Sequence, residues 1–165
     1  MHLVLEETIA ASVTIVFSVF TDLSHAAENI TSITKLEVLD KGPVGKGTRF
    51  RETRVVFKNK EATQEMEITA FDAPRSYTVE GTSCGVQYVT VYEFNGGQRE
   101  TKVTMTTSSR PVSLIGRITG PLMGWMVKGT LEKAMAADHA DLKGYCEARH
   151  AALSEGTSAE SSAPQ

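Results

Sequence analysis

The stretch "TKVTMTTSSRPVSLIGRITG", residues 101–120, contains the change of pattern that decides the fold. Up to Ser109, apolar or β-branched residues recur at every second position, which predicts a strand. After Pro111 the apolar residues follow helical spacing as far as about Ala152. The members of this series are Leu114, Ile118, Leu122, Met126, Leu131, Met135 and Leu142. The sequence therefore predicts a run of strands closed by one helix that is much longer than average.

The region before Pro111 forms a continuous series of strands. Between Ser32 and Ser109, six segments have the period of two and the β-branched or aromatic composition of strands. They read "ITKLEVLD", "GTRFRETRVVF", "EATQEMEITAF", "RSYTVEGT", "VQYVTVYEF" and "TKVTMTTSS". Their connections are mostly short and contain Gly, Pro, Asn and Asp, so consecutive strands are expected to pair antiparallel.

The N-terminal segment supplies one more strand and two short helices. The stretch "HLVLEETI" alternates well enough for a strand. Ser12 is placed to cap a helix, and a second helical piece is expected between Asp22 and Asn29. The apolar stripe of the first helix consists of Val13, Val16, Phe17 and Phe20.

These elements predict an α+β fold, in which a seven-stranded curved antiparallel sheet grips the long C-terminal helix, with two short helices after the first strand. A wide twisted sheet curls, and a helix about 10 Å across cannot fill its concave side. A gap is therefore expected between sheet and helix, and it is the natural place for a ligand. The domain is expected to span residues 1–152, followed by a small, polar and disordered tail at residues 153–165.

Composition and charge argue against several classes of partner. The formal net charge is -3 and Lys and Arg are scattered, so nucleic acid is not expected as a partner. The chain lacks an export signal and any apolar run of about 18 residues, so we expect a cytoplasmic protein without an integral membrane segment.

Cys84 and Cys146 lie in different predicted elements without metal-ligand spacing, and reduced thiols are expected. We expect no cofactor and no metal, and the pattern leaves the oligomeric state open between a monomer and a weak dimer.

Four segments resemble one superfamily. They are the opening strand with "ASVTIVFSVFTDL", then "ITKLEVLDKGPVGKGTRFRETR", "EATQEMEITAFDAPRSYTVEG", and the closing helix that ends "DLKGYCE". Over about residues 2–150 the chain resembles the START-like superfamily, also called SRPBCC or helix-grip, and within it the polyketide cyclase/dehydrase-like group. The resemblance implies a hydrophobic cavity between the sheet and the long helix. It supplies no catalytic motif that can be placed residue by residue.

Glu52 and Arg54 are the first candidate site residues. They lie two apart in "FRETR", so on a regular strand both share a face with Phe50 and Val56. Two apolar neighbours make this face a candidate for the cavity side, where the pair would orient a ligand carbonyl or hydroxyl, or satisfy each other. The alternative is a solvated surface pair, and the pattern leaves both interpretations open.

Other ligand-binding candidates are aromatic or flexible side chains. Tyr77, Tyr88 and Tyr92 each offer apolar area and a hydroxyl group, although core filling would explain them equally well. The remaining candidates are Phe50, Met66, Ile68, Phe94, Met105, Leu122, Trp125 and Met126.

The first part of the long helix contains residues that a helix interior disfavours. Gly116, Gly120, Gly124 and Pro121 all lie between Leu114 and Lys128. We interpret this segment as a compliant lid, with Leu122, Trp125 and Met126 facing the ligand. The alternative is that the glycines allow tight packing on the sheet. Pro121 is expected to bend or divide the helix near Ile118.

The remaining polar residues form no catalytic or metal-binding pattern. Glu65 and Glu67 alternate with Met66 and Ile68 and are expected to face solvent. His25 and His139 have no partner at metal or triad spacing and are expected at the surface or its boundary. The catalytic residues are therefore unknown from the sequence.

The sequence favours a protein that binds or transports a small hydrophobic molecule, lipid-like or aromatic and polyketide-like. The alternative is a cyclase or dehydratase that uses a cavity carboxylate or a tyrosine for proton transfer. An accessory protein with an incidental cavity stays open as a third interpretation.

Overall fold

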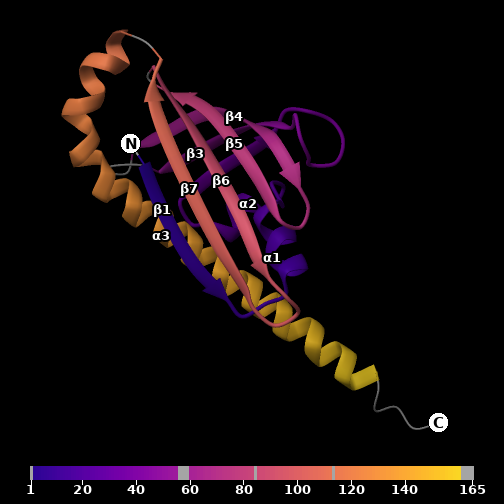
Figure 1. Cartoon of the computed structure of the whole chain (residues 1–165). Helices are drawn as coiled ribbons and strands as arrows, with labels where there is room; N and C mark the ends of the chain where they lie inside the picture. The colour runs from indigo at the N-terminus through magenta and orange to yellow at the C-terminus, as the bar shows by residue number, and fades with distance from the viewer. Residues whose placement is uncertain (1, 56–59, 84, 113, 161–165) are drawn as a thin grey trace.

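The computed structural model describes residues 2–55, 60–83, 85–112 and 114–160, and within the last helix it describes side chains for residues 129–155. Along the chain the elements are β1 (His2–Ile9), α1 (Val13–Phe20), α2 (Ala26–Asn29), β2 (Ile33–Val38), β3 (Arg49–Val55), β4 (Glu61–Asp72), β5 (Ser76–Ser83), β6 (Val86–Gly96), β7 (Thr101–Pro111) and α3 (Leu114–Glu160). This order confirms the predicted α+β fold (Figure 1).

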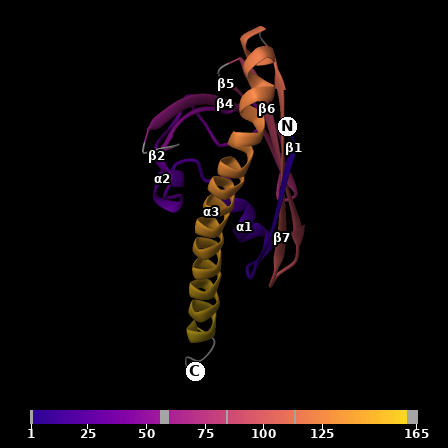
Figure 2. The same ribbon diagram turned by 90° about the vertical axis from the view of Figure 1, so that its left-hand side faces the viewer.

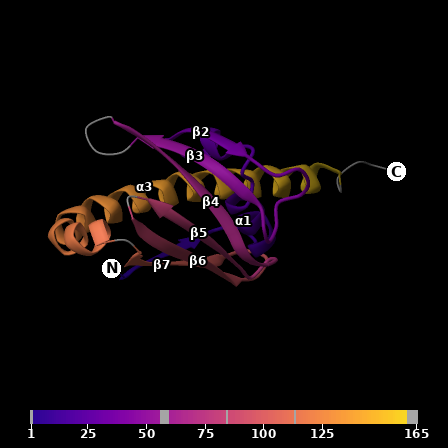
Figure 3. The same cartoon turned by 90° about the horizontal axis from the view of Figure 1, so that it is seen from above.

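The strands of the described residues form one antiparallel seven-stranded sheet with the order β1-β7-β6-β5-β4-β3-β2. From β1 the chain passes through α1 and α2 to β2 at the opposite edge, and then returns strand by strand to β7, which pairs with β1. Figure 2 shows the sheet curving around α3, as the sequence predicted. Figure 3 shows α3 lying along the sheet, with its C-terminal end projecting beyond the strands.

Helix α1 fills one end of the concave face. Its cap is Ser12, whose side chain accepts a hydrogen bond from the backbone N–H of Ile15 at 3.4 Å, as predicted. The buried rings of Phe17 and Phe20 each meet Phe94 edge to face, with ring centroids 5.3 Å apart. Edge-to-face contacts of this kind stabilise aromatic cores. At this end of the sheet, α1 and the strands therefore share one buried hydrophobic core.

The C-terminal half of α3 is fixed to the rest of the fold by apolar and polar contacts. Leu142 and Cys146 are buried in the same core as α1. The carboxylate of Asp141 accepts a hydrogen bond from the backbone N–H of Thr31 at 2.8 Å. Cys146 is a free thiol, as predicted, and burial raises its pKa to about 12. Cys84 lies outside the described residues.

Helix α3 continues past two positions at which the sequence suggests an interruption. Of the two outcomes predicted for Pro121, the helix is bent and not divided: Figure 1 shows its first, orange part bending away from the line of the rest. It also continues beyond Ala152 to Glu160, so the first part of the expected tail is helical. Extending a helix adds one hydrogen bond for each residue fixed, which is much easier than starting one. The lid interpretation concerns side chains between Leu114 and Lys128, which lie outside the described set.

Candidate functional site

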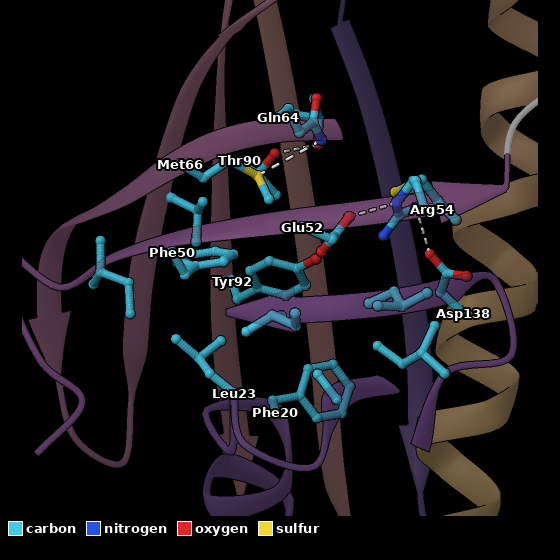
Figure 4. A pocket seen from close by; sticks show the side chains of 18 of the residues that line it. Phe20, Leu23, Phe50, Glu52, Arg54, Gln64, Met66, Thr90, Tyr92 and Asp138 are labelled. Carbon is cyan, nitrogen blue, oxygen red and sulfur yellow. Dashed lines mark hydrogen bonds and ion pairs between the residues drawn. The ribbon is translucent and has the colours of Figure 1, made fainter. Parts of the chain in front are cut away.

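A cavity of about 490 Å³ lies between the concave face of the sheet and α3. Its wall is mostly apolar, as Figure 4 shows, and includes Phe20, Leu23, Phe50, Met66, Ile68 and Met135. Pockets that hold small organic ligands span about 300–1,000 Å³ and are lined mainly by apolar side chains. The gap that the sequence predicted between sheet and helix is therefore present and large enough for such a ligand.

A group of charged side chains interrupts this apolar wall. Glu52 and Arg54 on β3 both face the cavity, and Arg54 Nε donates a hydrogen bond to Glu52 Oε1. Arg54 Nη1 donates to Asp138 Oδ2 on α3 at 2.9 Å, and Ser32 Oγ donates to Asp138 Oδ1 at 2.7 Å. The side chains of Glu52, Arg54 and Asp138 are only 7%, 16% and 8% exposed. We call these three residues the acid–guanidinium cluster, and it joins the sheet to α3 across the cavity.

Arg54 holds this cluster together. Burial acts to lower the pKa of the guanidinium, but the charges of Glu52 and Asp138 and their hydrogen bonds outweigh it and raise the pKa. Taking charged groups out of water costs several kcal/mol for each ion, and only well-placed partners offset that cost. The three side chains therefore depend on one another, and loss of Arg54 would leave both carboxylates without their shared partner.

Tyr88 extends the polar part of the wall across two strands. Its hydroxyl donates to Oε1 of Gln64 on β4, although Tyr88 itself is on β6. Gly81 on β5 is the residue directly opposite Tyr88, and a Cβ atom there would lie 2.8 Å from the tyrosine ring. The missing side chain is therefore what lets the ring cross β5. Burial, with the charge of Glu52, raises the pKa of Tyr88 to about 12, so the phenol remains a donor near neutral pH.

A stack of rings connects the sheet to α3. The rings of Tyr77 and Tyr92 are stacked with centroids 4.7 Å apart, and Tyr92 stacks on His139 at 6.1 Å. Burial raises the pKa of both tyrosines, so both hydroxyls stay protonated. His139 is 4% exposed, and among the described residues neither of its ring nitrogens has a hydrogen-bond partner. Burial lowers the pKa of His139, which keeps the imidazole neutral near pH 7.

Most of the candidates predicted from the sequence surround this cavity. Those that line it are Phe50, Glu52, Arg54, Met66, Ile68, Tyr77, Tyr88 and Tyr92. Phe94 does not line it, because its ring is packed against α1. Met105 does not line it either, although it is fully buried on β7, opposite Leu5 of β1 and Tyr92 of β6. The side chains of Leu122, Trp125 and Met126 lie outside the described set.

The structure also decides where several polar residues lie. Of the two interpretations left open for Glu52 and Arg54, the cavity position is the one observed, and Arg51, which precedes Glu52 on the strand, is exposed. Glu65 and Glu67 are exposed, as predicted. The prediction that His139 lies at the surface or its boundary is wrong, because this turn of α3 faces the sheet.

Sequence reasoning missed Asp138, although a signal was available. Leu131, Met135, Asp138 and Leu142 are spaced by four, three and four residues, so the aspartate falls on the apolar stripe of the helix. A carboxylate on a buried stripe requires a charged or hydrogen-bonding partner. Its partner, Arg54, is 84 positions away in the chain, and only the folded structure brings the two together.

Comparisons with known proteins agree with this architecture. The model of the family described as "Polyketide cyclase / dehydrase and lipid transport" matches residues 1–147. A solved structure from Thermus thermophilus is 19% identical with a TM-score of 0.70, covering 90% of this chain and 99% of that chain. The Zhui aromatase/cyclase from Streptomyces is 19% identical with a TM-score of 0.67, covering 90% of this chain and 94% of that chain.

A plant enzyme shares the fold as well. Norcoclaurine synthase from Thalictrum flavum, solved in complex with dopamine and hydroxybenzaldehyde, is 19% identical with a TM-score of 0.61, covering 88% of this chain and 85% of that chain. At these identities the likeness shows the fold alone. No curated protein matches the sequence.

The architecture and the family match together place this chain in a known family. Within the described residues no helix is long and apolar enough to cross a membrane. The cavity between a curved seven-stranded sheet and a long C-terminal helix, with short helices after the first strand, is the arrangement of the SRPBCC or helix-grip fold. On the match over residues 1–147, the chain belongs to the polyketide cyclase/dehydrase and lipid transport family of this fold.

Proposed function

We propose that this protein binds a small, largely apolar molecule inside the cavity, with the ligand's polar group held at the acid–guanidinium cluster. The observation that carries the proposal is the cavity of about 490 Å³, walled mainly by apolar side chains with charged groups gathered at one place. Burying apolar surface contributes about 25 cal/mol per Å², so such a wall favours an apolar guest. The description of the family, which includes lipid transport, supports the same function.

Two neighbouring residues on β6 provide a matched test. Thr90 lines the cavity, whereas Val89 beside it points to the other face of the sheet. The variant Thr90→Phe should fill part of the cavity and weaken binding of the neutral dye Nile red by about tenfold or more. The variant Val89→Phe should bind the dye as the wild type does. Fluorescence titration measures both affinities, and circular dichroism checks that both variants fold.

The same experiment can reject the proposal. If the wild type binds neither Nile red nor other neutral apolar compounds, the cavity does not serve as a binding site. Equal affinities in Thr90→Phe and Val89→Phe would place any bound dye outside the cavity. Native mass spectrometry of the purified protein adds an independent check, because a retained natural ligand would appear as a defined added mass.

A second candidate function is proton-transfer catalysis of the cyclase or dehydratase type, and the position of Glu52 favours it. Oε1 of Glu52 accepts from Arg54, while Oε2 accepts no hydrogen bond from the described residues. A positioned carboxylate can take a proton from a carbon next to a carbonyl, and a neutral phenol such as Tyr88 can donate to the carbonyl oxygen. In this case Glu52→Gln would keep ligand binding but lose turnover of a polyketide-like substrate. Unchanged turnover in that variant would exclude this mechanism.

A further inference from the structure

The charged side chains that line the cavity are unequal in number. Among the described lining residues the carboxylates are Asp22, Glu52 and Asp138, whereas the only cation is Arg54. His139 adds no positive charge near pH 7, because burial lowers its pKa. The described part of the wall therefore carries an excess of negative charge.

This excess is concentrated at the acid–guanidinium cluster. Asp22 is satisfied locally, because its carboxylate contacts Ser24 at 2.6 Å and His25 at 2.8 Å, and its side chain is 29% exposed. The cluster itself holds two carboxylates against one guanidinium, and all three side chains are mostly withdrawn from water. A charge imbalance in such a place is screened far less by salt than one on the surface.

One oxygen of the cluster is left for a ligand. Both oxygens of Asp138 accept hydrogen bonds, one from Ser32 and one from Arg54. Glu52 uses Oε1 for Arg54, and its Oε2 accepts no hydrogen bond from the described residues although the residue is only 6% exposed. Figure 4 shows Glu52 on the cavity wall, with Phe50 and Tyr92 beside it. A carboxylate oxygen on the cavity wall that has no donor among the described residues can accept a hydrogen bond from a ligand N–H.

We propose that the cavity selects molecules with an apolar body and a positively charged amine, with the ammonium group donating to Glu52 Oε2. This inference rests on the proposed binding function and adds the class of ligand. The ammonium would offset the excess negative charge, and the neighbouring ring of Phe50, which lines the cavity, attracts a cation at its face. A ligand that ends in a carboxylate would find Arg54 already paired twice and would be repelled by Glu52 and Asp138.

The test compares three ligands with the same apolar body in the wild-type protein. They are naphthalenes that carry an ethylamine, an ethanol or an acetate side chain, so that the polar end is cationic, neutral or anionic at pH 7. Isothermal titration calorimetry at low ionic strength should give the tightest binding for the amine, with the acetate weaker by about tenfold or more. Binding of the acetate as tightly as the amine overturns the inference.

Variants then show whether the cluster causes the preference. Glu52→Gln should reduce the affinity for the amine by about fivefold or more, while the affinity for the alcohol changes by less than about twofold. Glu65→Gln, on the exposed face of the next strand, should leave all three affinities unchanged. If Glu52→Gln does not fold, Asp138→Asn removes one negative charge from the same cluster and should reduce the amine preference in the same direction.

The outcomes separate this inference from the function on which it rests. If the alcohol binds in the cavity but the amine shows no advantage over the acetate, the amine preference is rejected and the apolar binding function stands. An amine preference that survives both variants would also reject the role of the cluster. If none of the three naphthalenes binds but Nile red does, the amine preference is rejected and the apolar binding function stands. If Nile red fails to bind as well, both are rejected.

Discussion

Strand β3 supports a glutamate–arginine pair on each of its two faces, and the pairs have the same chemistry in different surroundings. On the concave face Arg54 binds Glu52 and Asp138, and these side chains are between 7% and 16% exposed. On the convex face Arg51 binds Glu65 of β4, and the two side chains are 43% and 61% exposed. Arg51 and Arg54 are an odd number of residues apart on the strand, so their side chains point to opposite faces, and only Arg54 faces the cavity.

Comparison of the two faces indicates that burial decides how much an ion pair contributes to the structure. A solvent-exposed ion pair in general contributes only about 0–1 kcal/mol to the free energy of unfolding, because water solvates each separated partner almost as well. A buried pair is different, because each charge relies on its partners, and losing one leaves the others unsatisfied. The inner pair therefore fixes Asp138 and α3 over the cavity, whereas the outer pair leaves the fold largely unaffected.

The largest expected effect comes from removing the arginine on each face. Arg54→Met should lower the free energy of unfolding by about 3–5 kcal/mol, because Glu52 and Asp138 lose their shared partner. Arg51→Met should leave it almost unchanged, because the Arg51 side chain and its partner Glu65 are solvated. Urea unfolding followed by circular dichroism measures both values.

A double variant gives the control for this contrast. In the Arg54→Met background, Glu52→Gln removes one of the two unpaired carboxylates and should recover part of the lost stability. Similar losses for Arg54→Met and Arg51→Met would mean that burial does not separate the two faces.

The fold could be predicted almost completely from the sequence, because local pattern determines it. The period of two from Ser32 to Ser109, the cap at Ser12 and the helical spacing after Pro111 are each signals within a few residues, and the structure confirms the elements that they predict. The difference lies at the end of α3. The helix bends in its first part, one of the two outcomes predicted for Pro121, but it continues beyond Ala152 to Glu160.

The site could be predicted only in part, because it is made by contacts between distant segments. Alternation along β3 correctly grouped Glu52 with Arg54, but it could not show which face is covered. Asp138 and His139 come from α3, and their position against the sheet depends on how the helix crosses it. Gln64 was missed although it alternates onto the same face of β4 as Met66 and Ile68, because the hydrogen bond from Tyr88 that gives it a role exists only in the folded protein.

A smaller effect is expected from a glycine on the inner side of the sheet. A Cβ at Gly81 would lie 2.8 Å from the ring of Tyr88, so Gly81→Ala must displace the ring and weaken its hydrogen bond to Gln64. Overpacking of this kind costs about 1–3 kcal/mol. Gly97→Ala, where nothing lies within 4 Å of the new atom, should change stability by less than about 0.5 kcal/mol. Thermal unfolding measures the stability of the two variants. A Gly81→Ala variant as stable as the wild type would show that the Tyr88 ring can move aside without cost.

The smallest expected effect concerns pH and the inner face of α3. Burial lowers the pKa of His139 in the folded protein below the ordinary value of 6.5, although Asp138 and Glu7 act in the opposite direction. Below pH 6.5 the unfolded chain therefore takes up a proton at this residue while the folded protein still resists it. The contribution of His139 to the free energy of unfolding should fall as the pH drops below 6.5 and stay constant above it.

The variant His139→Phe isolates this contribution. It loses no hydrogen bond within the described residues, because both imidazole nitrogens lack partners there, and it keeps a ring against Phe20 and Tyr92. Carboxylates elsewhere titrate in both proteins, so they cancel when the two stabilities are subtracted. Urea unfolding at pH 5 to 8 should give a difference that grows in favour of the phenylalanine variant only below about pH 6.5. A difference that is constant across this range would mean that His139 takes up its proton equally well in the folded protein, and that the inner face is wetter than its burial implies.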